Sequence, residues 1–181
     1  PGLPWRQKAL MRSLGPLRKG DFGFVFARPE SGKTTFLADA ATFMAESLPD
    51  DAGPVGWWNN EEQGEKVKLR VIQATFGVSL AEIVRHRAHY KAEYERRIRG
   101  KIRILDESYI TPTIVEEWCQ KNKPSLLLFD QIDKIAGFEG ERRDILLGEI
   151  YKWFRNLAKK YCPVIGVCQS DGSGENVAYL T

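Results

Sequence analysis

The chain has 181 residues, of which 43% are hydrophobic and 28% are charged, and it carries a formal net charge of +3. This length suits one domain with a sizeable core, and the lack of an apolar run of about 18 residues excludes a membrane-spanning segment. The mildly basic charge permits contact with nucleic acid without requiring it. The three cysteines have no C-x-x-C spacing, so they predict packing residues in a reducing compartment rather than disulfides or zinc ligands.

The first half of the chain predicts two strands, each followed by a helical segment. The apolar residues 21–27 predict a buried strand, and side chains that recur at spacings of three and four predict a helix over 33–47. Residues 55–60 predict the second strand. A helix-compatible stretch follows, and its expected buried side consists of Val67, Leu69, Val71 and Ile72.

The second half of the chain predicts three more strands and three more helices. A run of mixed charge over residues 85–101 predicts a solvated helix. A helix is expected over 111–122, with a threonine cap and an early proline, and a long helix is expected from about Arg142 to Tyr161. The strands are predicted at residues 101–106, 124–130 and 162–169.

Strands that alternate with helices and are apolar throughout are typical of a parallel sheet that is covered on both sides. The sequence therefore predicts an α/β fold, a mostly parallel twisted sheet with helices on both faces. We expect residues 1–181 to form a single domain, with residues 1–18 as a lead-in segment and residues 170–181 as a loop-like tail.

A phosphate-binding loop is predicted between the first strand and the first long helix, where the sequence reads ARPESGKT. The usual pattern is G-x-x-x-x-G-K-[ST], and alanine replaces its first glycine here. Gly32 allows close approach of the backbone, Lys33 can reach the β- and γ-phosphates, and the hydroxyl of Thr34 can ligate Mg²⁺. The residues expected to contact the nucleotide are Ala27, Arg28, Pro29, Glu30, Ser31, Gly32, Lys33, Thr34 and Thr35.

Polar side chains at the ends of three other predicted strands complete a candidate site for ATP hydrolysis. Asp130 closes an apolar strand, as an acid that holds the Mg²⁺ water shell does, and Asp133 is the second choice for this role. Either Glu61 or Glu62 can act as the general base, although both also suit a helix N-terminus. Gln169 ends the last strand, where its amide can contact the γ-phosphate.

Four motifs resemble the RecA-like motor domains of hexameric replicative DNA helicases of the DnaB type and the phage primase-helicase type. These motifs are ARPESGKT, EEQGEKVKLR at 61–70, LLLFDQIDKI and LAKKYCPVIGVCQ. DnaB-type loops characteristically have alanine in place of the first glycine. The second motif aligns Glu61 with the family's catalytic glutamate, and the others align Asp130 with its Walker B acid and Gln169 with its glutamine.

The resemblance implies a RecA-like P-loop ATPase that uses ATP and Mg²⁺ as part of a hexameric ring on single-stranded DNA. The location implied is the cytoplasm, which is the host cytoplasm for a phage protein. A loop at 133–144 is a candidate DNA contact through Lys134, Arg142 and Arg143, with a solvated helix start as the alternative. The family's arginine finger and second DNA-contacting motif are expected outside this chain, so we expect weak hydrolysis from the isolated fragment.

Two other functions compete with the motor of a replicative helicase. A RecA-type recombination or annealing ATPase shares the fold and coats single-stranded DNA. A nucleotide-dependent regulatory or assembly module would use the nucleotide to control binding to a partner instead of driving translocation. The set of Lys33, Glu61, Asp130 and Gln169 argues against the second alternative, because a pure switch does not need all four.

Overall fold

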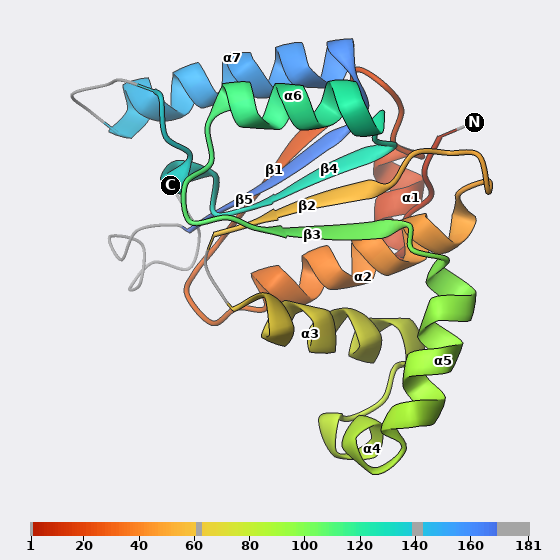
Figure 1. The fold of residues 1–181 in the computed structure, drawn as a ribbon. Helices are drawn as coiled ribbons and strands as arrows, with labels where there is room; N and C mark the ends of the chain where they lie inside the picture. The colour runs from red at the N-terminus through yellow and green to blue at the C-terminus, as the bar shows by residue number, and fades with distance from the viewer. Residues whose placement is uncertain (1, 61–62, 139–142, 170–181) are drawn as a thin grey trace.

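A computed structural model describes residues 2–60, 63–138 and 143–169, and its centre is a five-stranded parallel sheet (Figure 1). The order of strands across the sheet is β1-β5-β4-β2-β3, and every neighbouring pair is parallel. The strands are β1 (Phe22–Ala27), β2 (Val55–Asn59), β3 (Ile102–Asp106), β4 (Leu126–Asp130) and β5 (Val164–Gln169). All five predicted strands are thus confirmed, as is the parallel sheet.

Helices cover both faces of this sheet (Figure 1). One face carries α6 (Pro112–Asn122) and α7 (Arg143–Lys160), and the other carries α2 (Lys33–Ser47) and α3 (Gly64–Phe76). The remaining helical segments are α1 (Lys8–Leu14), α4 (Leu80–Arg85), α5 (Arg87–Ile98) and the short 3-10 helix η1 (Ile132–Lys134). Each face of the sheet has its own cluster of buried apolar side chains. The predicted α/β architecture is therefore confirmed.

Three details of the sequence prediction are corrected. Residues 8–14 of the lead-in segment form a helix, which was not predicted because none of its residues is buried. Leu69 is 36% exposed, since the buried positions Val67 and Val71 lie on the opposite side of α3, about 200° around the helix. The charged stretch is helical and largely exposed, but its helix begins at Arg87, after a break at His86.

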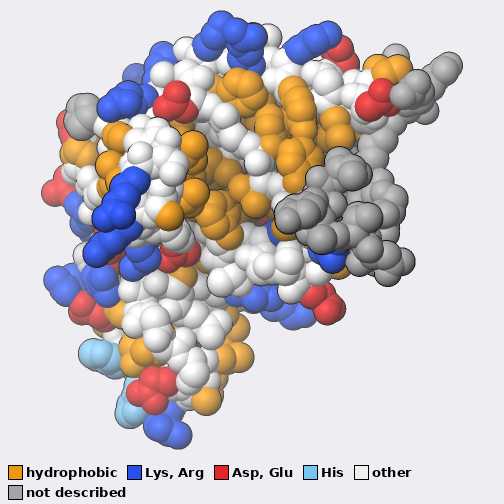
Figure 2. Space-filling view, turned by 180° about the vertical axis from the view of Figure 1, so that it is seen from behind, with side chains coloured by type: hydrophobic (Ala, Val, Ile, Leu, Met, Phe, Trp, Pro, Cys, Tyr) orange, Lys and Arg blue, Asp and Glu red, His pale blue; other side chains and the backbone are white. Residues whose placement is uncertain are grey.

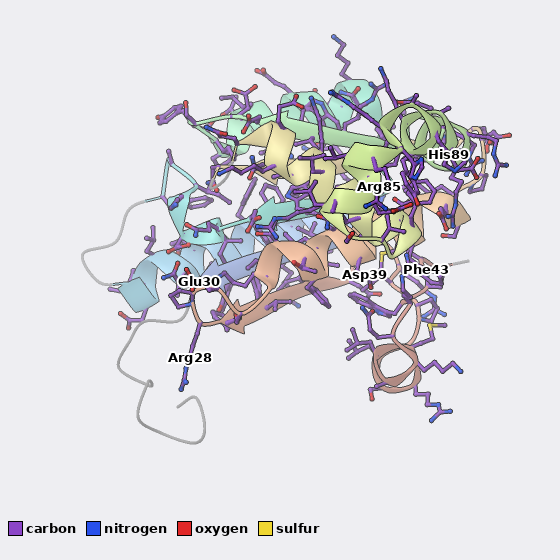
Figure 3. The ribbon with its side chains drawn as sticks, turned by 90° about the horizontal axis from the view of Figure 1, so that it is seen from below. Arg28, Glu30, Asp39, Phe43, Arg85 and His89 are labelled. Carbon is purple, nitrogen blue, oxygen red and sulfur yellow. The ribbon has the colours of Figure 1, made fainter. Side chains whose placement is uncertain are left out.

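The segment before β1 fastens α2 to the rest of the molecule. Trp5 is 7% exposed and stacks on Phe36. Arg6 forms an ion pair with Asp39, with 2.6 Å between Nε and Oδ1, and its guanidinium lies over the ring of Phe43. Asp39 and Phe43 both belong to α2 (Figure 3). These contacts hold the helix whose first turn follows the predicted phosphate loop.

β1 lies at an edge of the sheet and leaves apolar side chains on the surface. Phe22 is 37% exposed and Phe26 is 43% exposed. A hollow of about 560 Å³ next to this strand is lined by residues that include Trp5, Leu14 and Phe22. Figure 2, seen from behind, shows hydrophobic side chains gathered on this side of the molecule.

The cysteines pack in the interior. All three are free and buried, and burial raises the pKa of the Cys119 thiol to about 12. The thiol of Cys162 also has a raised pKa, again because of burial. The predicted packing role is confirmed. Among the helices that the structure describes, none has both the length and the apolar character needed to cross a membrane.

Gly166 in β5 marks the tightest packing of the sheet against η1 and α7. A Cβ at this position would lie 2.5 Å from Cγ2 of Ile132 and 2.6 Å from Cε2 of Phe154. We expect Gly166→Ala to lower the free energy of unfolding by roughly 1–3 kcal/mol, the usual cost of overpacking a core.

Urea denaturation of the two proteins measures this difference, and Gly148→Ala is the matched control. Gly148 lies in α7, where a Cβ meets no atom within 4 Å, so alanine should stabilise the helix by about 0.5–1 kcal/mol. Equal effects of the two substitutions would contradict the packing described at Gly166.

Candidate functional site

The carboxyl ends of the five strands meet at one edge of the sheet, and polar residues gather there. Ala27 of β1 pairs with Gln169 of β5, so the predicted phosphate loop and the predicted glutamine begin side by side. Asn59 of β2 pairs with Asp130 of β4 on one side and with Asp106 of β3 on the other. This edge is the usual place for ligands in open α/β sheets.

The loop between β1 and α2 has the geometry of an anion-binding turn. Gly32 is the residue before the helix and has a φ of 88°, in the region that favours glycine. The N-terminus of α2 has no side-chain cap and no acid in its first turn. The N-cap residue therefore leaves the amide groups of this turn without a cap of its own, as an anion bound at a helix N-terminus requires.

Internal hydrogen bonds hold the loop, and the carbonyl of Arg28 is their common acceptor. Ser31 donates to it from Oγ over 2.6 Å, and its backbone N–H donates over 3.3 Å. Glu30 has a φ of 57°, in the left-handed region. The side chain of Arg28 extends outward from the loop (Figure 3). The backbone thus forms a tight turn with this side chain on the outside.

Lys33 bends back over this loop. Its side chain is buried, with 7% of the residue exposed, and Nζ donates a hydrogen bond of 3.1 Å to the carbonyl oxygen of Arg28. An ammonium group held against the loop provides the positive charge that phosphate oxygens need. Its predicted contact with the β- and γ-phosphates stays a prediction.

Thr34 and Asp130 come together although 96 residues separate them in the sequence. The Thr34 hydroxyl donates to Oδ2 of Asp130 over 3.0 Å, and only 1% of Asp130 is exposed. A hydroxyl and a carboxylate are the hard oxygen ligands that Mg²⁺ prefers, so the two residues fit the predicted ion. The contact also favours Asp130 over Asp133, which lies in η1 after the strand has ended.

The structure describes only some of the other predicted site residues. Gln169 ends β5, as predicted, and the pairing of β5 with β1 brings it beside the loop. Glu61 and its rival Glu62 lie outside the described residues, as does Arg142. Lys134 is exposed in η1, and Arg143 is the first residue of α7. Their contact with DNA stays a prediction.

Sequence reasoning missed a polar bridge that joins the carboxyl ends of β2 and β3 to the start of α3. Nδ2 of Asn59 donates to Oδ1 of Asp106 over 2.9 Å, and the backbone N–H of Gly64 donates to Oδ2 over 3.0 Å. Nδ2 of Asn60 also donates to the carbonyl of Gln131, the residue after β4, over 3.4 Å. The available signal was the aspartate that ends the predicted strand at 101–106, as Asp130 ends the strand at 124–130.

A family model for an AAA domain matches residues 3–175. The chain belongs to this family. Comparison with curated proteins gave no match. The family is therefore established by a match that covers nearly the whole chain.

Two solved structures share the fold. One is described as "The Structure Of A DnaB-Like Replicative Helicase And Its Interactions With Primase", with 18% identity and a TM-score of 0.80 over 99% of this chain and 46% of that chain. The other is described as an ATPase domain, with 18% identity and a TM-score of 0.80 over 98% of this chain and 67% of that chain. This AAA domain chain thus spans about half the length of the first structure, and its predicted resemblance to helicase motor domains is confirmed in fold.

Proposed function

We propose that this AAA domain is the ATP-binding motor core of a replicative DNA helicase, coupling ATP hydrolysis to translocation on single-stranded DNA and duplex unwinding. The observation that supports it best is the hydrogen bond between Thr34 and Asp130, beside the buried Lys33. These groups come from β4 and the first turn of α2, and a P-loop ATPase uses a lysine, a hydroxyl and an acid of this kind to hold the phosphates and Mg²⁺ of its nucleotide.

Each group in the site has a distinct task in this proposal. Lys33 and the amides of residues 27–35 hold the phosphates of ATP, and Lys33 also offsets negative charge that develops during transfer. Thr34 ligates Mg²⁺, and Asp130 holds its water shell. When bound, Mg²⁺ neutralises charge on the β- and γ-phosphates. Glu61 accepts a proton from the attacking water, and Gln169 contacts the γ-phosphate.

The partners follow from the structural likeness and the motifs. One matched structure is described as a DnaB-like replicative helicase, and this chain shares its fold and carries the alanine form of the phosphate loop. We infer that the complete protein is a hexameric ring on single-stranded DNA in the cytoplasm. Lys134, Arg142 and Arg143 are the proposed contacts to DNA phosphates.

The decisive experiment is ATP-driven separation of a forked DNA duplex by the complete protein. We expect unwinding that requires ATP and Mg²⁺ and that Lys33→Ala removes, because the motor then lacks its nucleotide. A fluorophore and quencher on the two strands measure the separation.

Two results would replace the proposal. Hydrolysis that is stimulated by DNA without strand separation would indicate a RecA-type recombination or annealing ATPase. Nucleotide binding without any stimulation by DNA would indicate a regulatory or assembly module.

A further inference from the structure

Asp106, the last residue of β3, connects two separate parts of the chain through its carboxylate. Oδ1 accepts a hydrogen bond of 2.9 Å from the side-chain amide of Asn59, and Oδ2 accepts one of 3.0 Å from the backbone N–H of Gly64. Asn59 ends β2, and Gly64 begins α3. Both donors point to the same carboxylate, so this one side chain joins the end of β2 to the start of α3.

The fit between Asp106 and Gly64 is close. A Cβ on Gly64 would lie 2.8 Å from Oδ2 of Asp106, closer than a methyl group can come, and 3.1 Å from Cγ, which is a tight contact. The φ of Gly64 is not positive, so backbone conformation does not require glycine here. The absent side chain instead allows the carboxylate to reach the first turn of α3.

Asn59 links this bridge to the candidate nucleotide site. Its side chain is fully buried, and its strand pairs with β4 at Asp130. Asp106 thus contacts Asn59 and Gly64, which flank residues 60–63 in the sequence. This stretch includes the two candidate bases, Glu61 and Glu62. A general base must lie within hydrogen-bond reach of the water that it activates, so the ends of its segment need a fixed position.

We propose that Asp106 is a positioning residue for ATP hydrolysis, which acts by holding two residues at fixed places: Gly64, and Asn59, the strand neighbour of Asp130. This inference rests on the proposed ATPase function. Asp106 touches neither ATP nor the attacking water in this proposal. Its loss affects turnover and leaves nucleotide binding to the phosphate loop intact.

Asp106→Asn tests the proposal in the complete protein. Asparagine keeps the size of the side chain but replaces one acceptor oxygen with an amide that cannot accept. We expect kcat for ATP to fall by about 10- to 100-fold, since small misplacements of catalytic groups cost this much. The Kd for a fluorescent ATP analogue should stay within about twofold, and amide hydrogen exchange at Gly64 should accelerate as its acceptor is lost.

Glu107→Gln is the matched control, because it removes one negative charge from the neighbouring exposed position. We expect its kcat and its Gly64 exchange rate to equal those of the wild type. An Asp106→Asn protein with unchanged kcat and unchanged exchange would overturn the proposal, and so would an equal loss of ATP affinity. Absence of ATP turnover in the wild type would instead contradict the proposed function.

Gly64→Ala tests the same contact from its other side and does not alter the carboxylate. The added methyl must displace Asp106, so we expect the same fall in kcat with ATP affinity retained. Asp106→Ala with Gly64→Ala should be no slower than Asp106→Ala alone, since no carboxylate remains for the methyl to displace. Additive losses from the two substitutions would show that Gly64 and Asp106 act separately.

Discussion

Lys33→Ala should abolish tight binding of Mg·ATP. The ammonium group is buried against the phosphate loop, and the motif directs it to the β- and γ-phosphates. Hydrogen bonds to charged groups contribute about 1.5–3 kcal/mol each, so the loss of two such contacts weakens affinity by roughly 100-fold or more. Titration with a fluorescent ATP analogue in Mg²⁺ buffer measures the change.

Two controls separate this effect from a loss of folding. Lys152→Ala removes a lysine whose side chain is 73% exposed on α7, and its affinity for ATP should match that of the wild type. The thermal unfolding midpoint of Lys33→Ala without nucleotide should lie near that of the wild type. ATP affinity retained in a folded Lys33→Ala protein would mean that the loop at 27–34 does not hold the phosphates.

The phosphate loop and its acid could be predicted because their signals are local. Residues 27–34 lie within one turn between a strand and a helix, and Asp130 follows directly on a continuous apolar strand. Parallel strands of similar length bring such ends to one edge, so the fold class predicts that Thr34 and Asp130 lie at the same edge, while their direct contact also depends on the order of strands.

The bridge through Asp106 could not be predicted in the same way. It depends on β2 lying between β3 and β4, and the sequence contains no local signal for this order of strands. The ion pair between Arg6 and Asp39 is similar, since it joins the N-terminal segment to α2, which is distant in the sequence. Leu69 shows a different difficulty, because one apolar residue does not indicate which side of a helix is buried.

The proposed role of Glu61 rests on the motif resemblance, and the structure describes the residue that precedes it, Asn60. Asn60 donates to the carbonyl of Gln131, so the chain that leaves β2 is tied to the chain that leaves β4 just after Asp130. The next residue in the sequence is Glu61, and the resemblance to helicase motors aligns it with their catalytic glutamate. Glu61→Gln retains size and polarity but provides no carboxylate to accept a proton.

We therefore expect Glu61→Gln to lower kcat for ATP by roughly 10²- to 10⁴-fold, the usual contribution of a general base, while the Kd for ATP stays within a few fold. Single-turnover hydrolysis and equilibrium binding in the complete protein measure the two quantities. Glu62→Gln is the matched control, since it makes the same substitution one residue later and should retain turnover. A loss of turnover in Glu62→Gln with Glu61→Gln active would shift the base by one residue. Asp106 would keep its proposed task in that case, because both acids lie between Asn59 and Gly64 in the sequence.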